Sequence, residues 1–77
     1  MTRKLSELGR NQRGRIVSVS HEGPIAGRLW ALGMMPGVDV QVVGVAPLGD
    51  PLLVQMSGSR LSLRREEAEK LTVEADG

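Results

Sequence analysis

The chain has 77 residues, no cysteine, a formal net charge of +1 and a single aromatic residue, Trp30. This length corresponds to one domain with a small, aliphatic core. The lack of cysteine excludes a disulfide framework, and the near-zero net charge does not by itself select a nucleic acid or a membrane surface as partner.

The N-terminal segment, residues 1–13, is polar, but Leu5 and Leu8 are spaced to place one helical turn against a core. The β-branched stretch at residues 15–20 predicts a first strand. Apolar side chains occupy both faces of this stretch, so the pattern leaves open which face points inward.

A short helix is predicted after the first strand. Pro24 suits the first turn of a helix, where its missing N–H group is not needed. Apolar residues at positions i, i+4 and i+7 then form one face, namely Ile25, Leu29 and Leu32. Gly33 ends the helix, because glycine takes the left-handed conformation without a Cβ clash. A helix of about two turns is stable only when it packs against other structure.

Alternating valines predict a second strand after Pro36-Gly37, with Val38, Val40 and Val42 on one face. The alternation breaks at Val42-Val43, which predicts a bulge or sharp bend. Residues 47–51, Pro-Leu-Gly-Asp-Pro, form a reverse turn in which Asp50 and the glycine set shape rather than chemistry.

The C-terminal third of the chain predicts three more strands. Leu52, Val54 and Met56 form the inward face of the third, and Ser57-Gly58 is a hairpin signal before a fourth strand that contains Leu61 and Leu63. Residues 64–70 form a charged helical turn with Ala68 inward, and Leu71 and Val73 belong to a fifth strand.

The predicted fold is mainly β: a small, SH3-like five-stranded barrel with one short helix after the first strand and a single helical turn before the last strand. No repeat, low-complexity segment or linker divides the chain, so residues 1–77 are expected to form a single domain.

Several short motifs occur in a fixed order between Leu8 and Val73. Each is weak alone, but their order and spacing are fairly specific: Leu8-Gly9, Gly14 with Ile16, Arg28-Leu29, Leu32-Gly33, Pro36-Gly37, residues 46–51, residues 58–64, Glu67-Ala68 and Val73. In this order they resemble the FeoA family (ferrous iron transport protein A), small cytoplasmic SH3-like proteins. The chain is also similar to the C-terminal SH3-like domain of metalloregulators of the diphtheria toxin repressor type.

The resemblance implies a function but no catalytic residues. A FeoA protein would act beside a membrane-embedded ferrous iron transporter of FeoB type, by binding and modulating its cytoplasmic GTPase part. No DNA-binding helix-turn-helix precedes the predicted barrel and Met1 starts the chain, which favours a free-standing accessory protein. No cofactor is implied, and the direction of the modulation is left open.

Catalytic and metal sites find little support in the residues. His21 is the single histidine, and nothing brings a serine and an acid to it. No phosphate-binding or dinucleotide-binding glycine motif is present. Fe(II) accepts imidazole and carboxylate ligands, but the adjacent His21 and Glu22 rarely face one centre, so only an adventitious surface site is an alternative.

The candidate partner-binding residues are Trp30, Met34 and Met35. Trp30 lies about 100° around the helix from Leu29, hence at the edge of the core or outside it. It could be an apolar anchor for a partner, or its ring could close the barrel mouth. The methionines could bind copper, but the favoured interpretation is that one fills the core and the other is exposed.

A second function class, a nucleic-acid-binding barrel, depends on the basic N-terminus, with Arg3, Lys4, Arg10, Arg13 and Arg15. Against it, single-strand binders usually stack bases on several aromatic residues. The acidic C-terminus could instead neutralise this segment if the two ends lie side by side.

No apolar run is long enough to span a bilayer, and no apolar segment follows Arg3 and Lys4 as in a signal peptide, so a cytoplasmic location is expected.

Overall fold

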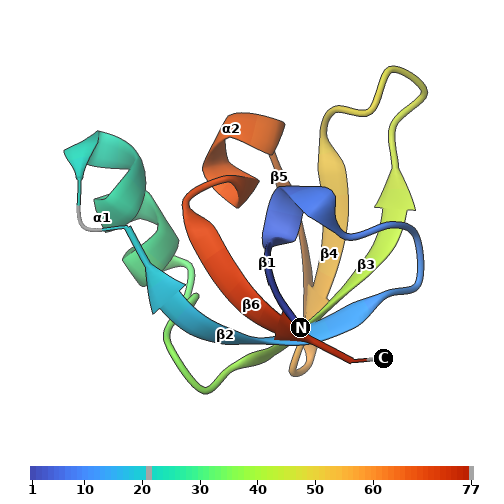
Figure 1. The fold of residues 1–77 in the computed structure, drawn as a ribbon. Coiled ribbons are helices and arrows are strands. Elements are labelled where there is room, and N and C mark those ends of the chain that lie inside the picture. Colours follow the sequence, from blue (N-terminus) through green and yellow to red (C-terminus); the bar gives the residue numbers. More distant parts are fainter. Residues whose placement is uncertain (21, 77) are drawn as a thin grey trace.

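The computed structural model describes residues 1–20 and 22–76, whose strands form one antiparallel sheet (Figure 1). The elements in chain order are β1 (Thr2–Lys4), a 3₁₀ turn η1 (Leu5–Glu7), β2 (Arg13–Val19), α1 (Gly23–Ala31), β3 (Asp39–Val45), β4 (Leu52–Met56), β5 (Ser59–Leu63), α2 (Arg65–Ala68) and β6 (Leu71–Ala75). The strand order is β1-β6-β2-β3-β4-β5, so the first and last strands are neighbours.

The predicted arrangement is confirmed, with one strand more than expected. A helix interrupts the sheet between β2 and β3, and the short α2 precedes the last strand. The described residues form six strands because β1 pairs with β6, with Thr2 opposite Glu74 and Lys4 opposite Thr72. The segment Thr2–Lys4 is exposed throughout, so it has no apolar alternation that could have predicted a strand.

Two bulges curve the sheet. In β2 the register with β6 shifts between Ile16 and Ser18, which brings both Ile16 and Val19 into the core and leaves Val17 exposed. This bulge explains why the sequence pattern placed apolar residues on both faces. The predicted bulge in β3 is confirmed by a shift between Val42 and Gly44.

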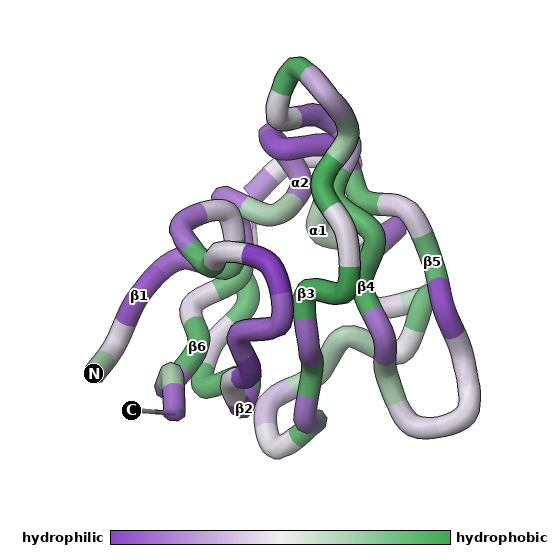
Figure 2. Tube along the Cα trace, turned by 90° about the vertical axis from the view of Figure 1, so that its right-hand side faces the viewer, coloured by the Kyte–Doolittle hydropathy of each residue, from purple (hydrophilic) through white to green (hydrophobic). Residues whose placement is uncertain are grey.

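The core is aliphatic and lies inside the curled sheet. Figure 2 shows hydrophilic and hydrophobic residues alternating over the first part of β3, whereas β4 is hydrophobic apart from Gln55. The helices and the 3₁₀ turn contribute Leu5, Leu29 and Ala68 to the interior. The strand residues in the core are Ile16, Val19, Val40, Val42, Leu52, Val54, Leu63, Leu71 and Val73, while the predicted inward residues Met56 and Leu61 are only partly buried. Burying one such side chain stabilises the fold by roughly 1.5–3 kcal/mol.

The two chain ends attract each other, as one of the sequence-based alternatives supposed. The amino group of Met1 lies 2.8 Å from Glu74 Oε1, and the Thr2 hydroxyl donates to Glu74 Oε2 at 2.9 Å. The ammonium group of Lys4 donates to the Thr72 hydroxyl at 3.3 Å. Part of the basic N-terminus is therefore held against the acidic last strand.

Candidate partner-binding site

The joint between α1 and β3 is closed by a Schellman motif. The N–H of Gly33 donates to the Trp30 carbonyl at 2.9 Å, and the N–H of Met34 donates to the Leu29 carbonyl at 3.0 Å. Gly33 has φ +86°, the left-handed conformation that this motif requires and that the sequence predicted. An apolar contact between the two flanking residues usually accompanies the motif, and here Leu29 and Met34 are both fully buried in the core.

This geometry separates the two adjacent methionines. Met34 is 0% exposed and Met35 is 40% exposed, so the prediction that one fills the core and the other is exposed is confirmed. The inclusion of Met34 among the partner-contacting residues is corrected, because the Schellman motif buries it beside Leu29. Met35 keeps its place in the candidate site.

Trp30 lies outside the core, as its helical angle from Leu29 predicts. It is 43% exposed, and it is not among the residues packed against the core. The alternative in which its ring closes the core is therefore not supported. Large apolar residues that stay exposed together are typical of interaction sites.

Strand β2 borders the same region. The N–H of Gly37 donates to the Ile16 carbonyl at 2.8 Å, which brings the segment after Met35 alongside Val17, another exposed apolar residue. We call Trp30, Met35 and Val17 the joint surface.

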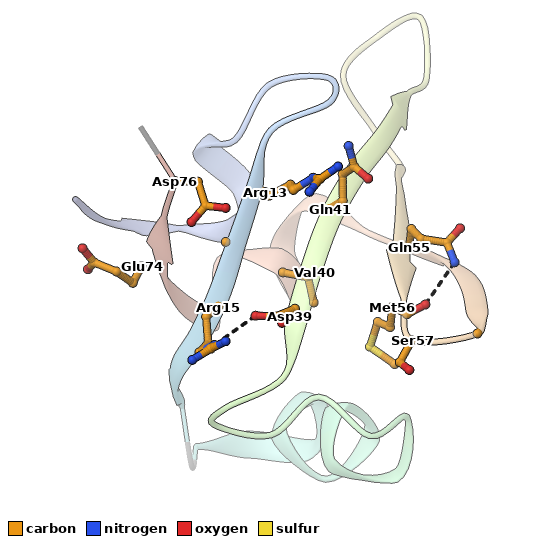
Figure 3. Close-up of a pocket in the computed structure, with 12 residues that line it drawn as sticks. Arg13, Arg15, Asp39, Val40, Gln41, Gln55, Met56, Ser57, Glu74 and Asp76 are labelled. Carbon is orange, nitrogen blue, oxygen red and sulfur yellow. Dashed lines mark hydrogen bonds and ion pairs between the residues drawn. The ribbon is translucent and has the colours of Figure 1, made fainter.

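A second concave region is polar. A pocket of about 760 Å³ is lined by β2, β3, the β4–β5 hairpin and the end of β6 (Figure 3). In it Arg15 Nε donates to Asp39 Oδ1 at 2.9 Å, and this bond lowers the pKa of the Asp39 carboxyl. The amino group of Met1 likewise lowers the pKa of Glu74. A general acid at neutral pH needs a raised carboxyl pKa, so these two carboxylates are unsuited to that chemistry.

Within residues 1–20 and 22–76 no three His, Asp or Glu side chains are grouped closely enough to hold a metal ion. The predicted pair of His21 and Glu22 is not located, because His21 lies outside those residues. Asp50 serves the turn, as predicted, since its Oδ1 accepts from the backbone N–H of Arg65 at 3.0 Å. None of the described helices has the length and apolar character needed to cross a bilayer.

Two residues of interest escaped the sequence analysis. Glu67 is 5% exposed. Its Oε1 accepts from the backbone N–H of Arg64 at 2.8 Å, and its Oε2 accepts from Arg28 Nε, which ties α2 to α1. Its position three residues after Arg64 has the spacing of a capping box.

Leu48, at the β3–β4 turn, is almost fully exposed, and nothing in the local sequence marked it.

The curled antiparallel sheet with its inserted helix belongs to the SH3-like class of small β domains. It superposes with a TM-score of 0.80 on the crystal structure of Stenotrophomonas maltophilia FeoA complexed with zinc, described as a procaryotic SH3 domain protein. The two chains are 38% identical, and the match covers 96% of this chain and 89% of that chain. The predicted SH3-like fold is thereby confirmed.

The particular family follows from the sequence match. The FeoA domain family matches residues 3–75, and this chain belongs to it, as the ordered motifs indicated. A fusion of Fe(2+) transport protein A with Fe(2+) transporter FeoB from Porphyromonas gingivalis is 38% identical over 71 residues. That match covers 92% of this chain but only 8% of the fusion protein.

The predicted similarity to metal-dependent repressors is confirmed at the level of the fold. IdeR of T. acidophilum superposes with a TM-score of 0.85 at 21% identity, over 97% of this chain and 34% of that chain. At this identity the match concerns the fold alone.

Proposed function

We propose that this chain is a non-enzymatic, cytoplasmic accessory protein of ferrous iron uptake. It binds the cytoplasmic GTPase part of a membrane ferrous iron transporter of FeoB type and modulates it. The observation that carries the proposal is the Porphyromonas gingivalis relative, in which one polypeptide joins Fe(2+) transport protein A to the FeoB transporter. Fusion raises the effective concentration of two modules that act together.

The joint surface supplies the contact in this proposal. Trp30 and Met35 are large, apolar and about two-fifths exposed. Aromatic residues dominate the energetics of protein interfaces, and Trp30 is the single aromatic residue of the chain. The helix that presents Trp30 is fixed to the core through Leu29 and Met34, so little ordering accompanies binding.

Binding is tested with the full-length transporter of the same organism in lipid nanodiscs, by biolayer interferometry against the purified chain. We expect Trp30→Ala and Met35→Ala to weaken binding about thirtyfold each, which is the lower end of the range of interface hot spots. The matched control Trp30→Phe retains an aromatic anchor and most of the affinity. The rate of GTP hydrolysis by the transporter is measured with and without a saturating concentration of the chain, and a change in this rate shows that binding modulates the transporter.

The proposal fails if the wild-type chain shows no specific contact with the transporter at micromolar concentrations. It also fails if a bound chain leaves the rate of GTP hydrolysis and of ferrous iron transport unchanged.

A further inference from the structure

The loop between β3 and β4 projects from the body of the domain (Figure 1). Leu48 is 97% exposed. The loop around it is closed by two backbone hydrogen bonds, from Ala46 N to the Pro51 carbonyl at 3.0 Å and from Gly49 N to the Ala46 carbonyl at 2.7 Å. Single exposed apolar residues are common on protein surfaces, so exposure alone does not single out Leu48.

The additional feature is that distant segments hold this turn in place. Arg65 Nε donates to the Gly49 carbonyl at 2.8 Å, and the backbone N–H of Arg65 donates to Asp50 Oδ1 at 3.0 Å. A second guanidinium nitrogen of Arg65 donates to the Ser6 carbonyl in η1. The backbone of the turn is therefore tied to α2 through Arg65, which also bonds η1, so the loop that carries Leu48 is held by contacts within the domain. Such preorganisation lowers the entropic cost of binding.

A pocket adjoins this turn. It has a volume of about 490 Å³ and is lined by Arg28, Asp50, Pro51, Ser62, Arg64 and Glu67. Both carboxylate oxygens of Glu67 are already engaged by hydrogen bonds. Among the described residues, the Arg64 guanidinium has no hydrogen-bond or ion-pair partner, and the Arg28 side chain remains half exposed beyond its bond to Glu67. Asp50 also lines the pocket, and its Oδ1 accepts from the backbone N–H of Arg65. The N–H donors left free there belong to the guanidinium groups of Arg28 and Arg64, which match a carboxylate.

This pocket lies on the opposite side of α1 from Trp30. Arg28, which lines the pocket, and Trp30 are two residues apart in the helix, which corresponds to a rotation of about 200°. The turn and its pocket are therefore separate from the joint surface.

We propose that Leu48 and the pocket with Arg28 and Arg64 form a second docking surface, which takes a protein segment carrying an apolar socket beside an acidic side chain. The inference rests on the proposed function, since that segment belongs to the cytoplasmic part of the transporter. A lipid surface fits less well, because interfacial anchoring requires a larger apolar area than the single exposed side chain of Leu48 offers.

The test uses the same full-length transporter in nanodiscs. We expect Leu48→Ser and Arg64→Glu each to weaken binding about tenfold. Two matched controls bind within about twofold of the wild type: Leu48→Met, which keeps the apolar side chain, and Arg13→Glu, which makes the same charge change in the other pocket. Thermal unfolding confirms that each variant is folded.

The outcomes separate this inference from the proposed function. If Leu48→Ser and Arg64→Glu bind as the wild type does while Trp30→Ala binds weakly, the second surface is wrong and the proposed function stands. If the wild-type chain binds empty nanodiscs and Leu48→Ser abolishes that binding, the ligand is lipid and the inference is overturned. If the wild-type chain does not bind the transporter at all, both proposals fall.

Discussion

At the scale of single residues, Gly33 decides what the α1–β3 joint exposes. Its φ of +86° is the left-handed conformation that costs a residue with a Cβ atom about 1–2 kcal/mol. The Schellman motif that it permits buries Met34 and leaves Met35 outside. The composition of the joint surface thus depends on one glycine.

Two glycine substitutions test this assignment. Gly33→Ala is expected to lower the free energy of unfolding by about 1–2 kcal/mol. Gly27→Ala lies within α1, where an added Cβ meets nothing within 4 Å, and should raise stability by about 0.5–1 kcal/mol because alanine favours helix. Urea unfolding followed by circular dichroism measures both. Equal effects of the two substitutions would contradict the role given to Gly33.

At the scale of elements, local patterns were sufficient for most of the fold. Helix α1, the bulge in β3, the Ser57-Gly58 hairpin and the turn at residues 47–51 all have signals within a few residues of sequence. Strand β1 has none, because its three exposed residues become a strand only by pairing with β6. The sequence of β2 also could not show which of its faces points inward, because its bulge is set by the register with the distant strand β6.

In the candidate site, too, some features have local sequence signals and others depend on distant residues. The exposure of Trp30 could be predicted from its angle to Leu29 within one helix. The roles of Glu67 and Leu48 could not, because each depends on an arginine far away in the sequence: Arg28 for Glu67, and Arg65 for the turn that carries Leu48.

The link between α1 and α2 depends on the buried carboxylate of Glu67. Glu67→Gln removes the negative charge that accepts from Arg28 Nε, and hydrogen bonds to charged groups contribute about 1.5–3 kcal/mol each. We expect a loss of about 1–3 kcal/mol in the free energy of unfolding. Glu69→Gln, a change at the exposed residue that follows α2, should stay within about 0.5 kcal/mol of the wild type. A Glu67→Gln variant as stable as Glu69→Gln would show that the link is not stabilising.

The contact between β1 and β6 should depend on pH. Hydrogen bonds from the Met1 amino group, and then from Thr2, lower the pKa of Glu74 below its ordinary value. A carboxyl group whose pKa is lower in the folded state stabilises the fold at pH values above its ordinary pKa. This stabilisation is lost as the pH falls through the folded-state pKa.

The wild type should therefore be more stable than Glu74→Gln at about pH 6, and this difference should shrink as the pH falls below the ordinary glutamate value of 4.5. Urea unfolding of both proteins across this range measures it. A difference that persists unchanged in acid would mean that charge at Glu74 is not its cause.

At the scale of the whole molecule, small size and two separate surfaces suit an accessory protein. The body measures 27 × 25 × 23 Å. The joint surface and the Leu48 turn with its pocket lie on different sides of α1, so one large partner could contact both only by reaching around the domain. Loss of either surface would then weaken binding while the other still holds.

The charge distribution of the folded molecule argues against the nucleic-acid-binding alternative. Met1 and Thr2 are held by Glu74, and Arg15 is paired with Asp39. Asp39, Glu74 and Asp76 line the same pocket as Arg13 and Arg15, so these two arginines lie among carboxylates. Trp30 is the single aromatic residue on which a base could stack.

We accordingly expect no salt-dependent binding of a fluorescent single-stranded RNA or DNA 20-mer at micromolar protein, measured by anisotropy. Glu74→Lys provides the responsive control: it removes the carboxylate beside β1, adds a positive charge there and should produce weak binding at low salt. Wild-type binding that falls steeply between about 50 and 200 mM salt would indicate counterion release. It would then restore nucleic acid as the partner, because only free basic side chains of the protein displace the counterions condensed on a phosphate backbone.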